Sequence, residues 1–481
     1  MELFARCARE PERLLAVTEA GARYTLADLN RAAERLSAAI GGHRLVFVLC
    51  RNSPGALLSY LGCMKGGAVP LLLDEAIPPD LLTQLVQLYQ PAFLSVPNDL
   101  PDATRQVLEG FVPAVEVEDS ILLRRPGENG PVLHPELALL LTTSGSTGSP
   151  KLVRLSDKNL DVNTRSIVSY LGLNEEERPV TNLAMSYSYG MSIINTHLMA
   201  GAPLVLTRSN LLQRAFWDLV ARERVTSLAG VPYTYQMYRR VGLMDMDLPH
   251  LRTMTQAGGK LPEALHLEFA DWAIRTDRRF FIMYGQTEAA PRMGYLPAEQ
   301  AVAKCGSMGI PVPGGTFQLL QEDGSEISQP HMVGELIYHG PNVSMGYAQQ
   351  PEDLALGDQW KGVLRTGDMA KRDEDGYYYI VGRKKRFVKL FGNRVNLDEV
   401  ERMLLTCFPD TDLACVGKDD LLTVFYCAKN EDLSTPIREF LCSRLSFAPR
   451  AFDVRAIDAL PKAESGKTQY AHLTALLDGG C

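Results

Sequence analysis

The sequence lacks three features that would each indicate a particular class of protein. It has no excess of positive charge: 49 lysines and arginines face 57 aspartates and glutamates, and the formal net charge is −8. We therefore expect neither nucleic acid nor an anionic membrane as a primary partner. It has no apolar run as long as a membrane span, and the stretch "MELFARCAREPERLL" carries charges where a signal peptide has an apolar core. These absences favour a cytoplasmic protein that acts on a small molecule.

Cysteine pairs of the C-x-x-C kind are also missing, so neither a zinc site nor a thioredoxin-like redox motif is expected. The cysteines are scattered and mostly lie in apolar contexts such as "LVFVLC", which predicts reduced residues of the core. The nine cysteines are Cys7, Cys50, Cys63, Cys305, Cys407, Cys415, Cys427, Cys442 and Cys481.

A Walker P-loop is absent as well, although one segment has the composition of an anion-binding loop. In "TTSGSTGSPK" (142–151), Pro150 stands where a P-loop has its second glycine, and Leu152 stands where it has a hydroxyl residue. Gly145 and Gly148 nevertheless allow successive backbone N–H groups to point into one concavity, which suits a phosphate. The apolar run before the loop and "KLVRLS" after it predict a hairpin with this loop at its tip. Taken alone, the segment is also compatible with a Ser/Gly-rich surface turn.

The length of 481 residues, 46% of them hydrophobic, predicts more than one domain. Apolar runs such as "RLVFVLC", "LALLLTT" and "RFFIMYG" alternate with helical patterns, which indicates α/β layers with largely parallel sheets. In residues 25–40, apolar residues recur at helical spacing, with Thr25 as the expected N-cap and Asp28 in the first turn. From about residue 305 the pattern changes to short strands of a barrel-like unit, and a smaller α+β unit begins near "GRKKRFVK".

Four further motifs follow the Ser/Thr/Gly loop in a fixed order: "MYGQTEAA" (283–290), "RTGDMAKRDEDGYYYIVGRKKR" (365–386), "KLFGNRVNLDEVE" (389–401) and "PKAESGKTQY" (461–470). Together the five motifs resemble the adenylate-forming superfamily of acyl- and aryl-CoA ligases, nonribosomal-peptide adenylation domains and firefly luciferase. The resemblance covers nearly the whole chain. It implies a large AMP-binding domain at 1–384 and a small mobile C-terminal domain at 385–481.

The resemblance assigns ATP and Mg²⁺ to particular residues. The loop would embrace the β- and γ-phosphates, Glu288 would be the Mg²⁺ carboxylate, and Thr287 would donate to the α-phosphate. Tyr284 would lie along the adenine, and Asp368 would bind the ribose hydroxyls, with Arg383 as its companion. The remaining residues assigned to the nucleotide are Thr143, Ser144, Gly145, Ser146, Thr147, Gly148, Lys151, Ala257, Gly258, Gly259, Gly285 and Gln286.

The same resemblance implies a two-step ligation with a moving domain. Lys467 would neutralise charge while the substrate carboxylate attacks the α-phosphorus. Lys385 would be the hinge, although the basic run 383–386 could also be a nuclear-localisation or nucleic-acid patch. The loop with Lys389, Gly392 and Asn393 would then admit the phosphopantetheine thiol of CoA or of a carrier protein.

The expected substrate pocket departs from the usual superfamily pattern. Tyr187 stands where CoA ligases usually carry histidine, and no acid occurs between residues 178 and 217 to pair with an α-ammonium group. We therefore expect a small or medium acyl, hydroxyacyl or aryl acid, unless Asp245 or Asp247 enters the pocket from elsewhere. The pocket residues expected from the resemblance are Tyr187, Tyr189, Gly190, Ile194, Val231, Pro232 and Gly258.

Three other functions remain open from the sequence. One is a non-catalytic scaffold that binds nucleotide or an acyl-carrier partner, which the joint presence of Glu288, Asp368, Arg383 and Lys467 disfavours. The second is an enzyme that adenylates amino acids. The third is phosphoryl transfer at the β–γ bond, which would yield ADP where adenylation yields AMP.

Overall fold

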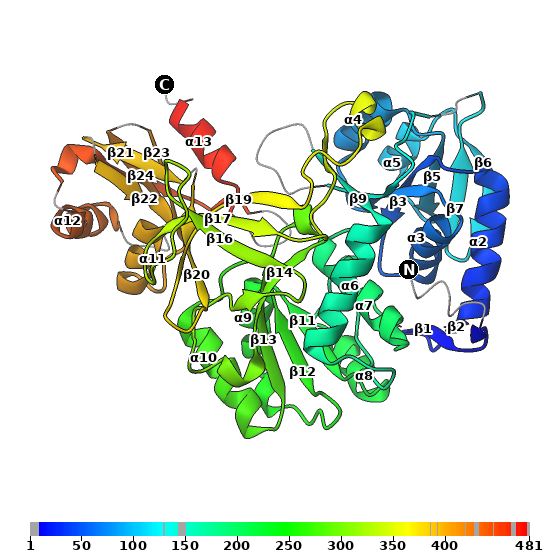
Figure 1. Ribbon diagram of the computed structural model, residues 1–481, viewed down its shortest axis with the longest axis horizontal. Helices are drawn as coiled ribbons and strands as arrows, with labels where there is room; N and C mark the ends of the chain where they lie inside the picture. The colour runs from blue at the N-terminus through cyan, green and yellow to red at the C-terminus, as the bar shows by residue number, and fades with distance from the viewer. Residues whose placement is uncertain are drawn as a thin grey trace. The chain divides into compact units, whose positions relative to one another are not determined.

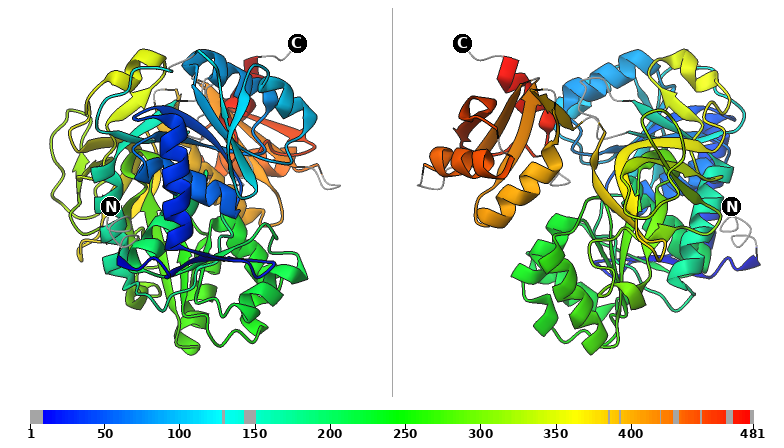
Figure 2. Two further views of the ribbon diagram at one scale, coloured as in Figure 1. Left: turned by 90° about the vertical axis from the view of Figure 1, so that its right-hand side faces the viewer. Right: turned by 60° about the vertical axis from the view of Figure 1, so that its left-hand side comes forward.

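The computed structural model describes residues 9–127, 130–142, 151–384, 386–391, 393–418, 420–427, 432–445, 447–462 and 468–478. These residues form two compact units, each with its own sheets (Figures 1 and 2). The first unit holds the described residues up to 142, those from 151 to 316, and 338–364. The second holds residues 317–337 and the described residues from 365 onward. The predicted boundary between 384 and 385 stays a prediction, because Lys385 lies outside the described residues.

The first unit contains an eight-stranded mixed sheet. Its spatial order is β18 (Gly346–Ala348), β9 (Leu152–Ser156), β8 (Leu137–Thr142), β4 (Val69–Asp74), β3 (Leu45–Cys50), β5 (Phe93–Pro97), β7 (Ser120–Arg124), β6 (Val112–Val117). The central strands β8, β4, β3 and β5 are parallel, and the flanking strands are antiparallel. The expected α/β class is confirmed, with parallel pairing at the centre of the sheet. The antiparallel pair β8–β9 confirms the predicted hairpin.

Alternate residues of the central strands face two different layers, as the period of a strand requires. Val46 and Val48 of β3 belong to a core shared with α2 (Leu26–Ile40) and α3 (Pro54–Lys65). Phe47 faces the opposite core, which includes α4 (Pro79–Tyr89). The sheet is therefore covered by apolar residues on both faces, which explains why its strands read as continuous apolar runs.

A second sheet of the first unit has five strands, and it positions the candidate site. They are β11 (Ser227–Gly230), β12 (Thr253–Gln256), β13 (Arg279–Gly285), β14 (Arg292–Leu296) and β15 (Ile310–Pro311). The first three are parallel, and the last two are antiparallel to their neighbours. In Figure 1, α9 (Pro232–Arg240) and α10 (Glu263–Arg275) lie on one side of this sheet, and α6 (Asp157–Leu171) and α7 (Ser188–Ala200) lie on the other.

The first unit is completed by a small sheet and several short helices. The sheet has the order β10 (Leu204–Leu206), β1 (Leu14–Thr18), β2 (Arg23–Thr25). The other helices are α5 (Asp102–Val107), α8 (Arg214–Arg222), η1 (Leu243–Asp245), η2 (Thr287–Ala289), η3 (Ala298–Gln300) and η4 (Pro351–Ala355).

The second unit combines a four-stranded sheet with an α+β part. The four-stranded sheet has the order β16 (Thr316–Leu320), β17 (Gly334–His339), β19 (Val363–Arg372), β20 (Tyr378–Arg383). The remaining elements are β21 (Phe387–Leu390), β22 (Asn393–Asn396), α11 (Leu397–Cys407), β23 (Leu413–Lys418), β24 (Leu421–Cys427), α12 (Ser434–Leu445), η5 (Pro449–Ala451), β25 (Phe452–Ile457) and α13 (Tyr470–Asp478). Apolar side chains of α11 and α12 pack on one face of the β23–β24–β25 sheet, and Leu473 of α13 packs on the other.

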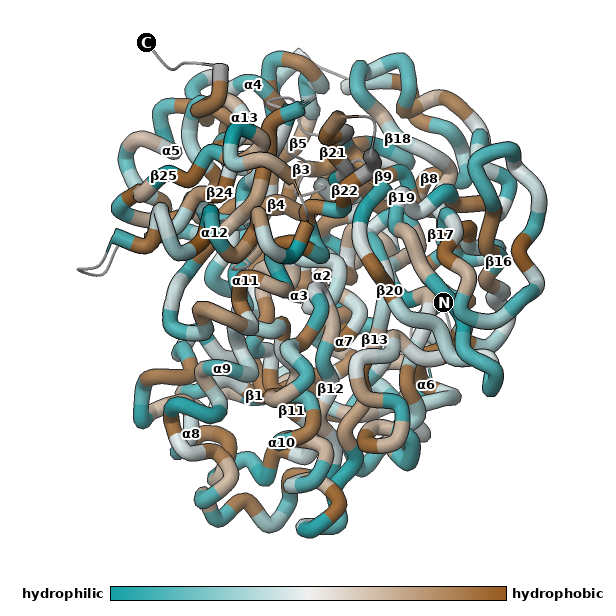
Figure 3. The backbone as a smooth tube through the Cα atoms, turned by 90° about the vertical axis from the view of Figure 1, so that its left-hand side faces the viewer, coloured by the Kyte–Doolittle hydropathy of each residue, from teal (hydrophilic) through white to brown (hydrophobic). Residues whose placement is uncertain are grey.

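Hydrophobic and hydrophilic stretches alternate along the chain (Figure 3). None of the helices formed by the described residues combines the length and the apolar character needed to cross a membrane. Seven of the nine cysteines are described, and all seven are free thiols. Cys50, Cys63 and Cys415 are buried, whereas Cys407 is exposed, so the expectation of core cysteines holds for only part of the set.

Candidate nucleotide and acid site

Three segments predicted for the site follow three neighbouring parallel strands. Val231 follows β11, Gly258 follows β12, and Glu288 lies in η2, just after β13. The strands are in register, with Gly230 opposite Gln256. The carboxyl ends of parallel strands meet at one sheet edge, where α/β proteins commonly bind ligands. The sheet therefore gathers segments that are far apart in the sequence.

Gly258 is packed against predicted pocket residues. Its φ of +84° is readily accessible only to glycine, and a Cβ there would lie 2.6 Å from Tyr187 Oη and 3.0 Å from Val231 Cγ1. A Cβ on the neighbouring Gly259 would lie 3.1 Å from Pro232 Cγ. Tyr187, Val231, Pro232 and Gly258 are thus brought together, and a side chain at position 258 would take space from this wall.

A buried amide holds the turn after β12. The Gln256 Nε2 donates to the carbonyl oxygens of Ala257 at 3.1 Å and of Gly259 at 2.9 Å. The Ala257 N–H donates to the Gly230 carbonyl at 3.1 Å, which ties the turn to the end of β11. The Gln256 side chain has no solvent exposure, and its hydrogen bonds fix the conformation of the glycine turn beside the pocket.

Tyr284 and Gln286 lie at the end of β13 and are half-buried. Gly285, between them, has no room for a side chain, because a Cβ there would lie 1.8 Å from the Pro291 carbonyl oxygen. Glycine at 285 therefore allows Pro291, the residue just before β14, to lie directly against the end of β13.

Glu288 receives a hydrogen bond from a residue that the sequence interpretation missed. Tyr347 Oη donates to Glu288 Oε1 at 2.6 Å. Burial raises the pKa of Tyr347, and the Glu288 charge raises it further, so the phenol stays protonated and donates. Lys151 Nζ lies 5.3 Å from the centroid of the Tyr347 ring, and Tyr347 pairs with Val153 of β9. The base of the Ser/Thr/Gly hairpin therefore lies beside Glu288.

The residues around Glu288 fit a magnesium ion that is shared with phosphates. Mg²⁺ is commonly held by one or two carboxylates together with substrate phosphate oxygens and water. Glu288 is half-buried and commits one carboxylate oxygen to Tyr347. Thr287 Oγ1 lies 3.1 Å from Ser188 Oγ of α7, which positions one more hydroxyl group nearby. No cluster of three or more acidic, histidine or cysteine ligands occurs in the described part of the chain.

The interior of the pocket wall is aromatic and carries one cation. Tyr189 is buried and donates through Oη to Thr255 Oγ1 at 2.8 Å. The Arg292 guanidinium carbon lies 4.6 Å from the Tyr189 ring centroid. Burial raises the pKa of Tyr170 to about 12, and the Arg292 charge acts against this increase. Tyr170 in turn stacks on Tyr295, with ring centroids 4.0 Å apart.

Two predicted pocket residues have other surroundings. Ile194 packs in the core of the eight-stranded sheet. Its neighbour Ile193 lines a small cavity in the first unit, which Tyr189 and Arg292 also line. The helical period of α7 separates the two side chains by about 100°, so only one of them can face the pocket. Gly190 lies against the backbone of Ala184, since a Cβ there would be 2.1 Å from the Ala184 carbonyl oxygen.

The acids that the sequence left open for an amino-acid substrate do not line this cavity. Asp245 and Asp247 are both exposed to solvent. The residues that line the cavity include no aspartate or glutamate among those that the structure describes. The pocket wall described here thus has no carboxylate with which to pair an α-ammonium group.

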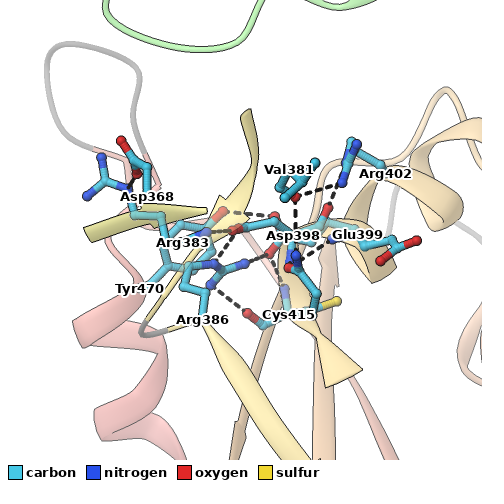
Figure 4. Close-up of polar contacts among 11 residues, drawn as sticks. Asp368, Val381, Arg383, Arg386, Asp398, Glu399, Arg402, Cys415 and Tyr470 are labelled. Atoms are coloured by element: carbon cyan, nitrogen blue, oxygen red, sulfur yellow. Dashed lines mark hydrogen bonds and ion pairs between the residues drawn. The ribbon is translucent and has the colours of Figure 1, made fainter. Parts of the chain in front are cut away.

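In the second unit, Asp368 and Arg383 are cross-strand partners on β19 and β20. Arg383 Nε lies 3.1 Å from Asp368 Oδ1, and the two side chains face each other in Figure 4. The Asp368 side chain is 5% exposed and that of Arg383 is 63% exposed, so the carboxylate is screened mainly by protein atoms and the guanidinium by water. The sequence analysis expected Arg383 to accompany Asp368, and the structure shows the two side chains in direct contact.

Beyond Arg383, a polar network links β20 to α11 (Figure 4). Asp398 Oδ2 accepts from the Arg383 backbone N–H at 2.9 Å, and Asp398 Oδ1 accepts from Arg386 Nε at 2.5 Å. Arg402 Nη2 donates to the Val381 carbonyl at 2.9 Å. In this conformation, α11 is thus hydrogen-bonded to the strand that precedes the predicted hinge.

Several predicted site residues lie outside the described residues, so their roles stay predictions. For Lys389 and Asn393 the structure describes only the backbone, in the antiparallel pair β21–β22. The others are Thr143, Ser144, Gly145, Ser146, Thr147, Gly148, Lys385, Gly392 and Lys467.

Arg292, Tyr347 and Thr255 were not singled out by the sequence interpretation. Arg292 had a usable signal: it is a charged residue four positions after Glu288, at the start of the apolar strand "RMGYL". Tyr347 had none, because it comes from β18, 59 residues along the chain from Glu288. Its position depends on strand pairing that local sequence does not reveal.

Known proteins resemble this chain in sequence and in overall fold. The profile of a family described as AMP-binding enzyme matches residues 3–348. The chain is 26% identical over 477 residues to 3-hydroxybenzoate–CoA ligase of Aromatoleum sp. (strain CIB), covering 91% of this chain and 88% of that protein. It is 30% identical over 354 residues to oxalate–CoA ligase of Arabidopsis thaliana, covering 70% and 67%.

The fold is shared with solved structures. The o-succinylbenzoate CoA synthetase of Bacillus subtilis, in complex with the acyl-adenylate OSB-AMP, aligns with a TM-score of 0.78 at 20% identity, over 98% of this chain and 97% of that chain. A second structure of that synthetase, in complex with ATP and a magnesium ion, also aligns with a TM-score of 0.78. At this level of identity the likeness concerns the fold, and it confirms the expected architecture.

Proposed function

Because the chain belongs to the AMP-binding enzyme family, we propose that it is an AMP-forming ligase that joins a carboxylic acid to a thiol. The substrate carboxylate attacks the α-phosphorus of ATP, which gives an acyl-adenylate and pyrophosphate. The thiol then attacks the acyl carbon and releases AMP. CoA is the proposed acceptor because the relatives are named as CoA ligases; the phosphopantetheine of a carrier protein is the alternative.

One observation carries this proposal more than any other. The carboxyl ends of β11, β12 and β13 bring the pocket wall, the glycine turn and Glu288 to one edge, and the base of the Ser/Thr/Gly hairpin lies beside Glu288 through Tyr347. An acid-binding wall is therefore next to groups suited to a triphosphate. This is what attack of a carboxylate on ATP requires.

The chain's own residues have distinct tasks in the proposed first step. When bound, Mg²⁺ neutralises the phosphate charge, and Glu288 supplies its carboxylate ligand. Thr287 donates to the α-phosphate, and Tyr284 packs along the adenine. Asp368, held by Arg383, accepts hydrogen bonds from the ribose hydroxyls. Lys467 adds a positive charge where negative charge develops.

ATP–pyrophosphate exchange across a panel of carboxylic acids tests the proposal, because it detects acyl-adenylate formation without knowledge of the acceptor. We expect acid-dependent exchange, AMP as the nucleotide product, and further AMP release when CoA is added. Formation of ADP, or exchange that no acid stimulates, would contradict the proposal. The exposed positions of Asp245 and Asp247 favour an acid without an α-ammonium group, so each amino acid is compared with its deamino analogue.

A further inference from the structure

Arg292 is a buried cation whose position is tightly determined. Arg292 is 3% exposed and is the first residue of β14. The Asn163 side chain donates to the Arg292 carbonyl at 2.7 Å, and the Asn342 side chain donates to the same oxygen at 3.0 Å. Two buried amides from different segments therefore hold the backbone from which this guanidinium projects.

The Arg292 guanidinium has neutral partners but no carboxylate partner among the described residues. Nη2 donates to Ser192 Oγ at 3.3 Å, the Tyr170 hydroxyl is a second hydrogen-bond partner, and the guanidinium lies over the Tyr189 ring. Nε is buried and has no hydrogen-bond partner. None of the described aspartates or glutamates forms an ion pair with Arg292. Two hydroxyl groups and an aromatic face compensate a buried cation only in part.

Other buried arginines of the chain are fully compensated. Arg154, with no exposure, donates to the carbonyl oxygens of Met345, Tyr347, Leu356 and Gly357 and to the Gln359 side chain. Arg51, also buried, pairs with the carboxylates of Asp99 and Asp119. The contrast indicates that the compensating group of Arg292 is supplied from outside the described residues.

Arg292 lines a cavity of about 20 Å³ within the pocket wall. Tyr189, Ser192 and Thr255 line the same cavity, and Tyr187 and Ala257 belong to the surrounding apolar cluster. His197 also lines it, but burial lowers the pKa of His197, so the imidazole is neutral there and adds no charge. Arg292 is thus the source of positive charge among the described lining residues.

We propose that the acid substrate carries a second negatively charged group, and that this group pairs with the Arg292 guanidinium. The substrate class is then a short dicarboxylic acid, with one carboxylate activated by ATP and the other bound at Nε and Nη2 of Arg292. This inference rests on the proposed function. The cavity beside Arg292 is small, about 20 Å³, which limits how far the substrate extends past Tyr189. The same charge repels an α-ammonium group.

The test compares acids that differ only in the second charge. ATP–pyrophosphate exchange is measured with malonate, succinate and glutarate, with their neutral monoamides, and with unbranched monocarboxylates of equal length. We expect the best diacid to exceed its monoamide in kcat/KM by about tenfold or more, because a charge-assisted hydrogen bond is replaced by a neutral one. The loss should appear mainly in KM, since the second group takes no part in the reaction at phosphorus.

Arg292→Met should reverse the preference for the diacid. Its kcat/KM for the diacid should fall, whereas its kcat/KM for the monocarboxylate of equal length should stay the same or rise. Arg292→Lys should keep part of the preference for the diacid. Ser192→Ala is the matched control: it removes a contact of the guanidinium but leaves the charge, so the preference should persist. Thermal unfolding and AMP binding report whether each variant is folded, and if Arg292→Met does not fold, the wild-type comparison and Arg292→Lys decide.

Equal use of diacids and monoamides by the wild type would overturn this inference and leave the proposed function standing. So would an Arg292→Met variant that is folded and keeps the full preference for diacids. The absence of exchange with every acid would instead contradict the proposed function, and the inference with it.

Discussion

At the scale of single residues, Gly258 leaves open the space beside Tyr187 in which we propose that the acid binds. We expect Gly258→Ala to lower kcat/KM for acid-dependent exchange by about tenfold or more, because the added methyl group enters the space next to Tyr187 Oη and Val231. Gly21→Ala is the control. Gly21 has a similar φ of +82° but no atom within 4 Å of its added Cβ. It should show a comparable backbone cost of about 1 kcal/mol with unchanged kinetics; equal kinetic losses in both variants would contradict the pocket role.

Tyr347 donates to Glu288, the proposed Mg²⁺ ligand, so replacing Tyr347 should change how the enzyme responds to Mg²⁺. Tyr347→Phe keeps the ring beside Lys151 but removes the hydrogen bond to the Glu288 carboxylate. A hydrogen bond to a charged group contributes about 1.5–3 kcal/mol, so exchange should fall by about tenfold to a hundredfold. The apparent Mg²⁺ requirement, measured by titration at fixed ATP, should shift. A fall in exchange with an unchanged Mg²⁺ curve would separate Tyr347 from the metal site.

At the scale of elements, α2 begins with a cap that the sequence predicts. Thr25 Oγ1 accepts from the Asp28 N–H, and the Asp28 carboxylate accepts from the Thr25 N–H at 2.7 Å. Thr25→Ala should lower the free energy of unfolding by about 1 kcal/mol, with exchange kinetics unchanged. Thr25→Ser keeps the hydroxyl group and should be close to wild type. If chemical denaturation gives the same loss for both variants, the cap is not the cause.

At the scale of the whole molecule, two buried histidines should make stability depend on pH. Burial lowers the pKa of His197 and of His266 from 6.5, so the unfolded chain binds these protons more tightly than the folded chain. Stability is therefore complete above about pH 6.5 and is lost as pH falls below it. Urea midpoints measured from pH 7.5 to 5.0 should decrease, and His197→Gln should lose part of this decrease. An identical pH profile in the variant would contradict the assignment.

The two half-reactions should respond differently to Lys467, which lies outside the described residues. Lys467→Ala should reduce exchange by about a thousandfold, since charge stabilisation at phosphorus contributes several kcal/mol. Thiol transfer from supplied acyl-AMP should survive, because no charge then develops at the α-phosphorus on attack. Single-turnover assays of each half-reaction measure this, and equal loss in both would refute the assignment.

Sequence alone determined the features that rest on neighbours in the chain. Apolar runs predicted β3, β8 and β13, hydroxyl and acidic spacing predicted the α2 cap, and the strand after Lys151 predicted the β8–β9 hairpin. Strand period, capping and turn formation act over a few residues, so local sequence carries them. The order of the five motifs likewise identified the family, which the profile match supports.

Tertiary structure alone decided which side chains meet. Whether Ile193 or Ile194 faces the pocket depends on the rotation of α7 against two cores, and Tyr347 reaches Glu288 only because β18 pairs with β9. The buried, incompletely paired state of Arg292 is a property of everything packed around it, from Asn163 to Asn342. Long-range packing sets the burial and the partners of a charge, and these determine what the charge can bind.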